Sequence, residues 1–212
     1  MRRLWALLIL AGGCAGEPAA ATPSRAPDPR DPKDPEMSRT APDVFRVRFE
    51  TARGGFTVEA TRAWAPRGAD RFYNLARAGF FDGARFFRVV PGFVAQFGLP
   101  ADPRLAAAWK TATFPDDPVK TSNARGTVTF ATAGPNTRTT QLFVNYGNNA
   151  RLDGMGFAPF AKVVDGMPVV DAIHAEYGER PNQGRIQSEG EAYLAQEFPR
   201  LDVIRSARLV NE

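Results

Sequence analysis

The sequence predicts a mainly β fold, a closed antiparallel barrel with helices over its ends, and three observations support this prediction. Residues 44–51 alternate apolar and charged side chains with a period of two, which is typical of a half-buried strand. Short segments of the same character recur along the chain, separated by turns rich in Gly, Pro and Asn. Only two or three segments have the apolar spacing of helices, and many short strands with few helices favour a barrel.

The predicted strands begin with a hairpin. Phe45, Val47 and Phe49 share one face of the first strand, and the turn at residues 53–55 contains two glycines. The next segment repeats the alternation and completes the hairpin. The predicted strands are residues 44–51, 56–60, 86–90, 93–97, 128–131, 142–146 and 201–210.

Three segments are predicted helices. The first begins near Pro66, because proline suits the first helical turn, and Gly79 ends it. The second follows Pro168 and carries an apolar stripe at residues 169–173. The third opens at residues 188–191, whose Ser-Glu-Gly-Glu sequence is a capping-box pattern, and we expect it to be an extra C-terminal helix.

The composition indicates one folded domain and excludes several kinds of site. A chain of 212 residues, 43% of them apolar, can bury one sizeable core. The net charge of +4 includes no run of three basic residues, which disfavours nucleic-acid binding because phosphate contacts need clustered cations. Cys14 is the only Cys and His174 the only His, which excludes an intramolecular disulfide, a Cys-based or multi-His metal site and a His triad. We expect no metal and no cofactor.

The N-terminal residues predict export and a tether. Residues 1–13 combine a basic start with an apolar stretch of eight residues, and a bilayer-spanning helix needs about 20, so they indicate a signal peptide. Leu10-Ala11-Gly12-Gly13-Cys14 resembles the lipobox of bacterial lipoproteins, which implies a diacylglycerol on Cys14 and a membrane anchor in the cell envelope. Ala15 after it implies the periplasmic side of the outer membrane. The alternative is an ordinary signal peptide followed by a chance cysteine.

Residues 14–42 are rich in Pro and contain no aromatic residue, which predicts a disordered linker between the lipid-attachment Cys14 and a folded domain at 43–212.

Three segments, 81–98, 130–144 and 152–167, place polar residues inside apolar strands. The first contains Phe87-Arg88-Val89-Val90-Pro91-Gly92-Phe93 followed by Gln96. The second contains Ala133-Gly134-Pro135-Asn136-Thr137 followed by Gln141-Leu142-Phe143, and the third begins with Leu152-Asp153-Gly154. Together these strings resemble the cyclophilins over about residues 43–210.

The resemblance implies an eight-stranded antiparallel barrel capped by two helices, with peptidyl-prolyl cis-trans isomerase activity on proline-containing unfolded or flexible polypeptides. It implies that Arg88 is the catalytic guanidinium, with Gln96 beside it, and that Phe93 belongs to the catalytic group as part of the floor of a proline pocket. The substrate-binding positions that it implies are Val94, Ala131, Thr132, Ala133, Gln141, Phe143 and Leu152. We expect a monomer that needs no cofactor.

Several positions depart from the commonest cyclophilin pattern. Arg151 stands where many members have Trp, and residues 155–157 lack a His common there. Phe97 and Leu99 replace a Gly and an Asp after Gln96. These changes bear on cyclosporin binding and substrate preference more than on activity.

The chemistry required of such a site follows from the X-Pro bond itself. Rotation faces a barrier of ~18–20 kcal/mol because the amide nitrogen shares its lone pair with the carbonyl. A fixed cation that donates a hydrogen bond to the twisted nitrogen stabilises only the transition state, and an apolar slot can hold the proline ring meanwhile.

Other interpretations remain. The same pocket could serve a binding module or holdase with little turnover, or the barrel could hold a small ligand in the manner of lipocalins. Phe93 and Phe143 would by default be core residues, and Gln96 and Gln141 surface residues of strands. Arg151 is interpreted as a rim charge, and His174 as structural or merely exposed.

Overall fold

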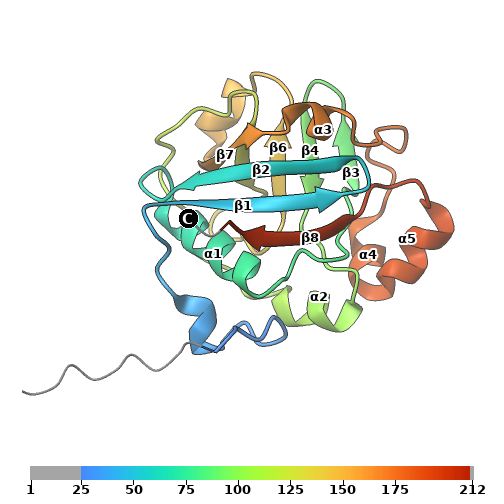
Figure 1. Ribbon diagram of the computed structural model, residues 1–212, viewed down its shortest axis with the longest axis horizontal. Coiled ribbons are helices and arrows are strands. Elements are labelled where there is room, and N and C mark those ends of the chain that lie inside the picture. The colour runs from blue at the N-terminus through green and yellow to red at the C-terminus, as the bar shows by residue number, and fades with distance from the viewer. Residues whose placement is uncertain (1–24, 211–212) are drawn as a thin grey trace, which may run out of the picture.

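The computed structural model describes residues 25–210, so the expected signal peptide and Cys14 lie outside the described residues (Figure 1). Eight strands form one antiparallel sheet in the order β3-β4-β6-β5-β7-β2-β1-β8. Their bounds are β1 Val44–Thr51, β2 Gly54–Thr61, β3 Arg88–Val90, β4 Val94–Phe97, β5 Thr127–Phe130, β6 Leu142–Asn145, β7 Pro159–Asp165 and β8 Ile204–Leu209. All seven predicted strands are present, and β7 is one that the sequence pattern did not predict.

The sheet is an open, curled half-barrel, so the predicted closed barrel is wrong. β3 and β8 are its two ends, and between them there is only an isolated bridge of Arg85 with Val203 and a few backbone hydrogen bonds beside it. Closure fails because β3 is only three residues long and its free edge is taken elsewhere: the Val89 amide donates to the Gly178 carbonyl, at 3.1 Å.

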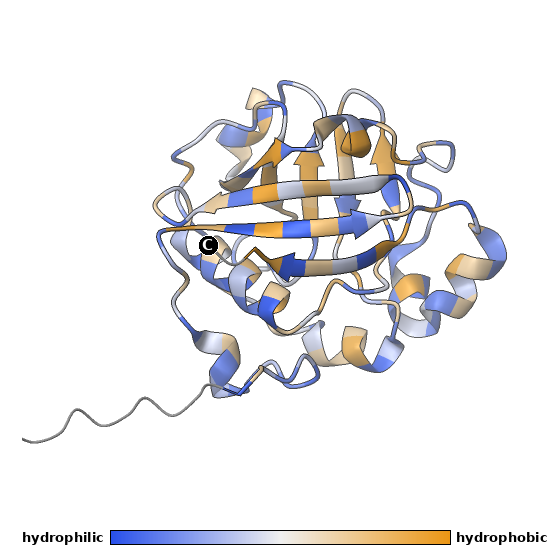
Figure 2. Cartoon of the chain, in the orientation of Figure 1, coloured by the Kyte–Doolittle hydropathy of each residue, from blue (hydrophilic) through white to orange (hydrophobic). Residues whose placement is uncertain are grey.

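The concave face of the sheet encloses an aromatic core. Figure 2 shows hydrophobic and hydrophilic residues alternating along β1, and the apolar ones face inward. The Phe49 ring stacks on Phe56 with 4.9 Å between ring centroids and meets Phe97 edge to face at 5.7 Å. Phe72 brings α1, Pro66–Arg77, onto this core, as the predicted first helix requires. The core holds the sheet rigid behind the strands that carry the candidate site.

Residues 25–210 contain five α-helices, more than the sequence predicted. The helix α3, Met167–Asp171, is the predicted second one, while α2, Pro103–Trp109, was not predicted. The predicted third helix begins later than its capping-box pattern, at α5, Glu191–Glu197. Ser188 instead lies inside α4, Gln183–Glu189, where its hydroxyl donates to the Gly184 carbonyl at 3.1 Å. Gly190 separates the two helices with a φ of 59°, which only glycine adopts readily.

The structure differs from the expected linker over residues 25–42, which lie against the domain. Met37, in the 3-10 helix η1, Pro35–Ser38, is 7% exposed and belongs to the main core. The Trp109 indole donates to the Pro29 carbonyl at 2.7 Å, and the Asn74 amide donates to the Arg39 carbonyl at 2.7 Å. A segment of this composition could not fold alone, but α1 and α2 supply both the apolar surface and the hydrogen-bond donors that it lacks.

A second apolar cluster lies beside the sheet and fixes the C-terminal helices. It packs Phe87 and Leu99, which flank β3 and β4, against residues from α4, α5 and their neighbours. Its remaining members are Tyr177, Ile186, Tyr193, Leu194, Phe198 and Leu201. Within residues 25–210, no helix is both long and apolar enough to span a bilayer.

Candidate active site

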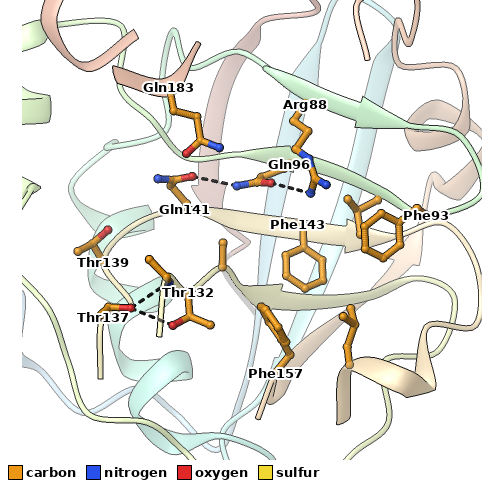
Figure 3. A pocket seen from close by; sticks show the side chains of 14 residues that line it. Arg88, Phe93, Gln96, Thr132, Thr137, Thr139, Gln141, Phe143, Phe157 and Gln183 are labelled. Atoms are coloured by element: carbon orange, nitrogen blue, oxygen red, sulfur yellow. Dashed lines mark hydrogen bonds between the residues drawn. The ribbon is translucent and has the colours of Figure 1, made fainter. Parts of the chain in front are cut away.

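A cleft of about 390 Å³ lies on the outer face of β3, β4 and β6, and Figure 3 shows the side chains that line it. It brings together all ten residues that the sequence predicted for the catalytic and substrate-binding positions. The lining residues are Arg88, Phe93, Val94, Gln96, Ala131, Thr132, Ala133, Thr137, Thr139, Gln141, Phe143, Leu152, Phe157 and Gln183. The structure therefore places these residues at one site, and their individual roles remain predictions.

Strand register explains why three of these side chains meet. Arg88 lies directly opposite Gln96, and Gln96 lies opposite Phe143, so all three point to the same face of the sheet. Their chain neighbours alternate to the other face, where Ala95 and Val144 are completely buried in the core. The apolar half of each strand thus anchors the sheet while the other half forms the cleft.

A line of hydrogen bonds crosses the upper part of the cleft (Figure 3). The Arg88 Nη1 donates to Gln96 Oε1 at 3.3 Å, and Gln96 Nε2 donates to Gln141 Oε1 at 2.9 Å. Gln96 is buried, with 6% of its surface exposed, whereas the Arg88 side chain is 28% exposed. The guanidinium therefore stands at the cleft surface with a buried amide behind it.

The side of the cleft around Phe143 and Phe157 is apolar (Figure 3). Val94, Phe143 and Leu152 form a small buried cluster of their own, separate from the main core, and Phe93 and Phe157 pack against it. The Phe143 and Phe157 rings meet edge to face with 5.8 Å between centroids. An apolar slot beside a cation can hold a ring such as pyrrolidine while leaving its nitrogen within reach of the guanidinium.

Buried amides behind the slot hold its loops in place. Asn145 is fully buried, and its Nδ2 donates to Thr127 Oγ1 at 2.9 Å. Asn149 Nδ2 donates both to Asn145 Oδ1, at 2.7 Å, and to the Phe93 carbonyl, at 2.9 Å. Asn123 Nδ2 donates to the Phe157 carbonyl at 2.8 Å, so the network positions residues on two sides of the slot. These asparagines were not predicted from the sequence, because nothing in local periodicity separates a buried amide from a turn residue.

Asp153 completes this network at the 3-10 helix η2, Ala150–Met155, which carries Leu152. Its carboxylate accepts hydrogen bonds from the Ser122 hydroxyl at 2.6 Å and from the Asn123 backbone amide at 2.9 Å. Partial burial alone would raise the pKa of Asp153, but the hydrogen bonds from Ser122 and Asn123 outweigh it, and the net pKa is lowered. The charged form of Asp153 is therefore the one that the folded site favours.

The opposite wall is a loop that presents its backbone. The hydroxyls of Thr132 and Thr137 form a hydrogen bond of 3.0 Å, and the Ala133 amide donates to Thr137 Oγ1 at 3.0 Å. Arg138, nearly buried beneath the loop, donates to the Gly156 carbonyl and pairs with Asp116. These contacts fix the loop that contributes Ala131, Thr132 and Ala133 to the cleft.

Five side chains at the site were not predicted, and two of them, Thr137 and Thr139, line the cleft from the loop before β6. Phe157 was noticed only as a departure from the cyclophilin pattern, although it packs against the slot. Gln183, the first residue of α4, lines the cleft. Glu179 lies just before α4, and its carboxylate contacts Arg88. No short-range signal could have found them, because 91 residues separate Glu179 from Arg88.

Arg151 and His174, which were predicted to have no catalytic role, do not line the cleft. The Arg151 guanidinium is exposed and lies 4.7 Å from the centroid of the Phe93 ring, beyond the lining residues, as expected of a rim charge. His174 packs edge to face on Tyr177, with 5.1 Å between centroids, away from the cleft. Among residues 25–210, no group of three or more His, Cys, Asp or Glu side chains is placed to hold a metal ion.

Comparison with known proteins gives consistent matches in sequence and in structure. A family profile described as cyclophilin type peptidyl-prolyl cis-trans isomerase/CLD matches residues 46–190. Peptidyl-prolyl cis-trans isomerase B of Escherichia coli is 31% identical over 180 residues, covering 78% of this chain and 99% of that protein. Peptidyl-prolyl cis-trans isomerase ppi1 of Schizosaccharomyces pombe is 32% identical over 144 residues, covering 65% of this chain and 92% of that protein. A solved Cryptosporidium parvum cyclophilin type isomerase shares the fold, with a TM-score of 0.61 at 20% identity, covering 80% of this chain and 99% of that one.

Proposed function

The chain belongs to the cyclophilin-type peptidyl-prolyl cis-trans isomerases, and on that premise we propose that it isomerises exposed X-Pro bonds of unfolded or flexible polypeptides in the cell envelope. Arg88 is the proposed catalytic group. Uncatalysed isomerisation takes tens to hundreds of seconds, so a catalyst of this step speeds the folding of exported chains. The isomerase activity itself follows from the family, and the envelope role and the residue assignments are the proposal.

The geometry of the cleft supports a mechanism by transition-state stabilisation. The amide nitrogen becomes pyramidal and regains its lone pair as the bond twists, and it can then accept a hydrogen bond that the planar ground state cannot. Arg88 is held by Gln96 at 3.3 Å, and the planar fork of N–H donors of an arginine suits it to this role. The slot formed by Phe93, Phe143 and Leu152 fixes the proline ring while the carbonyl side rotates. Rotation breaks no covalent bond, so the mechanism needs no nucleophile.

The observation that carries the proposal is the position of the Arg88 guanidinium at the edge of the apolar slot, 5.6 Å from the centroid of the Phe93 ring. A protease-coupled peptide assay on the purified protein tests it. Arg88→Ala should lower kcat/KM about 10²- to 10³-fold, as loss of one preorganised transition-state donor does. The rate should vary little between pH 6 and 9.

Arg46→Ala is a matched control, because Arg46 is an exposed arginine of β1 paired with Glu59, on a strand remote from β3 in the sheet order. It should leave kcat/KM within twofold of wild type. Wild-type protein no faster than buffer, or Arg88→Ala within threefold of wild type, would contradict the proposal. A holdase would instead suppress aggregation of an unfolded client equally well with and without Arg88.

We further propose that the enzyme is a monomer held by a lipid on Cys14 at the periplasmic side of the outer membrane. The lipobox-like residues 10–14 support this, and the folded body already begins by residue 25. Ten residues stand between Cys14 and residue 25, so a chain of that length sets an upper limit of about 35 Å on their separation. Mass spectrometry of the mature N-terminus should find a diacylglyceryl Cys14 that Cys14→Ser lacks. A mature chain that starts elsewhere, or an unmodified Cys14, would refute the anchor.

A further inference from the structure

Residues 176–190, called here the wall segment, run alongside the strand that carries Arg88. The Val89 amide donates to the Gly178 carbonyl at 3.1 Å, so this segment occupies the free edge of β3. Tyr177 is buried and meets the Phe198 ring edge to face at 5.1 Å. The Asn182 amide donates to the Tyr193 hydroxyl at 3.0 Å. The wall segment is thus fixed to β3 on one side and to the second apolar cluster on the other.

One side chain of the wall segment lines the cleft, and a second contacts Arg88 at its edge. Gln183, the first residue of α4, lines it next to Gln141 (Figure 3). Glu179 contacts Arg88 at Nε and Nη2, the edge of the guanidinium that Gln96 does not use. Because an arginine has five N–H donors, two remain for a substrate when these three contacts are made. The carboxylate therefore holds the guanidinium without blocking it.

The Glu179 carboxylate keeps one oxygen for a ligand. Both of its contacts with Arg88 use Oε1, which leaves Oε2 to accept a hydrogen bond, and the side chain is 62% exposed. Exposed ion pairs contribute little to stability, so we expect the Glu179–Arg88 pair to add little to the stability of the fold. The effect of Glu179 on the cleft is electrostatic.

The charge balance of the cleft depends on this carboxylate. Among the described residues that line the cleft, Arg88 is the only charged one, and Arg151 adds a second cation near the Phe93 ring. With these two cations alone, the site would attract acidic peptides. Glu179 offsets the charge of Arg88, which leaves Arg151 as the remaining cation, and the free oxygen of Glu179 can pair locally with a cationic side chain bound on the β3 side of the cleft.

We propose that the wall segment is a specificity-determining wall of the cleft, in which Glu179 makes the isomerase favour X-Pro segments with Lys or Arg beside the proline over segments with Asp or Glu. The inference rests on the proposed function of the same cleft and adds a substrate class to it. Glu179 acts on the charge of the bound chain and not on the twisting bond, which Arg88 contacts.

Tetrapeptides that are blocked at both ends, so that neither terminus is charged, test this inference on the full chain. One series places Lys, Ala or Glu directly before the proline, and a second series places the same residues directly after it. In at least one series, wild type should show kcat/KM about three- to tenfold higher for Lys than for Glu at low salt. The ratio should fall toward 1 in Glu179→Gln and in 1 M NaCl, because screening weakens exposed charges. Glu179→Asp should keep most of the preference.

Glu176→Gln is the matched control, because Glu176 lies in the same segment but pairs with Arg200, away from the cleft. It should keep the wild-type ratio. An active wild type without a charge preference overturns this inference alone, as does a Glu179→Gln variant whose ratio is unchanged in both series. A wild type inactive on every peptide overturns the proposed function and this inference with it.

Discussion

Replacing Gln96 by Leu tests whether Arg88 must be held from behind in order to act. Gln96 Oε1 accepts from Arg88 Nη1 at 3.3 Å, and its Nε2 donates to Gln141 Oε1 at 2.9 Å. Leu has a similar volume and can make neither hydrogen bond. Arg88 would then be held only by Glu179, an exposed carboxylate on the other side.

The expected loss of activity follows from the first of these hydrogen bonds. Hydrogen bonds to charged groups contribute about 1.5–3 kcal/mol, and a long one such as this belongs at the lower end. About 1.4 kcal/mol corresponds to a tenfold change in rate, so Gln96→Leu should lower kcat/KM about tenfold, mainly through kcat. Stability should fall by no more than about 1–2 kcal/mol, because the hydrogen bond from Arg88 is lost while Gln141 is partly exposed and can turn to water.

The peptide assay together with urea denaturation separates these two effects. Gln96→Glu keeps an acceptor for Arg88 and should recover activity to within about threefold of wild type. Gln196→Leu, an exposed glutamine on α5, is the control for the substitution itself. If Gln96→Leu keeps its activity within twofold of wild type while folding normally, Gln96 does not position Arg88.

Two further predictions concern the amides and the carboxylate behind the slot. Asn145→Leu should lower the free energy of unfolding by about 2–4 kcal/mol, because it leaves the buried partners of the amide unsatisfied. Urea denaturation measures this loss, and a loss under 1 kcal/mol would contradict the role of the amide network. Asp153 has a pKa lowered below its ordinary value of 3.8, so its charge stabilises the fold above that pH and the benefit is lost as pH falls through the folded-state pKa. Asp153→Asn should therefore lower Tm at pH 7, and the gap to wild type should narrow by pH 3, whereas a gap independent of pH would exclude the linkage.

The local elements could be predicted because their signals are local. The period-two alternation of residues 44–51 marks β1 correctly, and Pro66 marks the start of α1. The prediction was wrong where two neighbouring signals compete. Ser188 and Glu191 have the spacing of a capping box, yet Gly190 between them ends one helix and begins the next.

Sequence by itself determined most of the strands, because alternation is a property of neighbouring residues, and its resemblance to the cyclophilins implied the family and the ten residues that meet in the cleft. Tertiary structure alone decided that the sheet stays open, that residues 25–42 lie on α1 and α2, and that Glu179 meets Arg88. Each of these outcomes depends on which strand edge, carbonyl or guanidinium nitrogen is still unpaired once the chain has folded, and the partner that satisfies it comes from a remote segment.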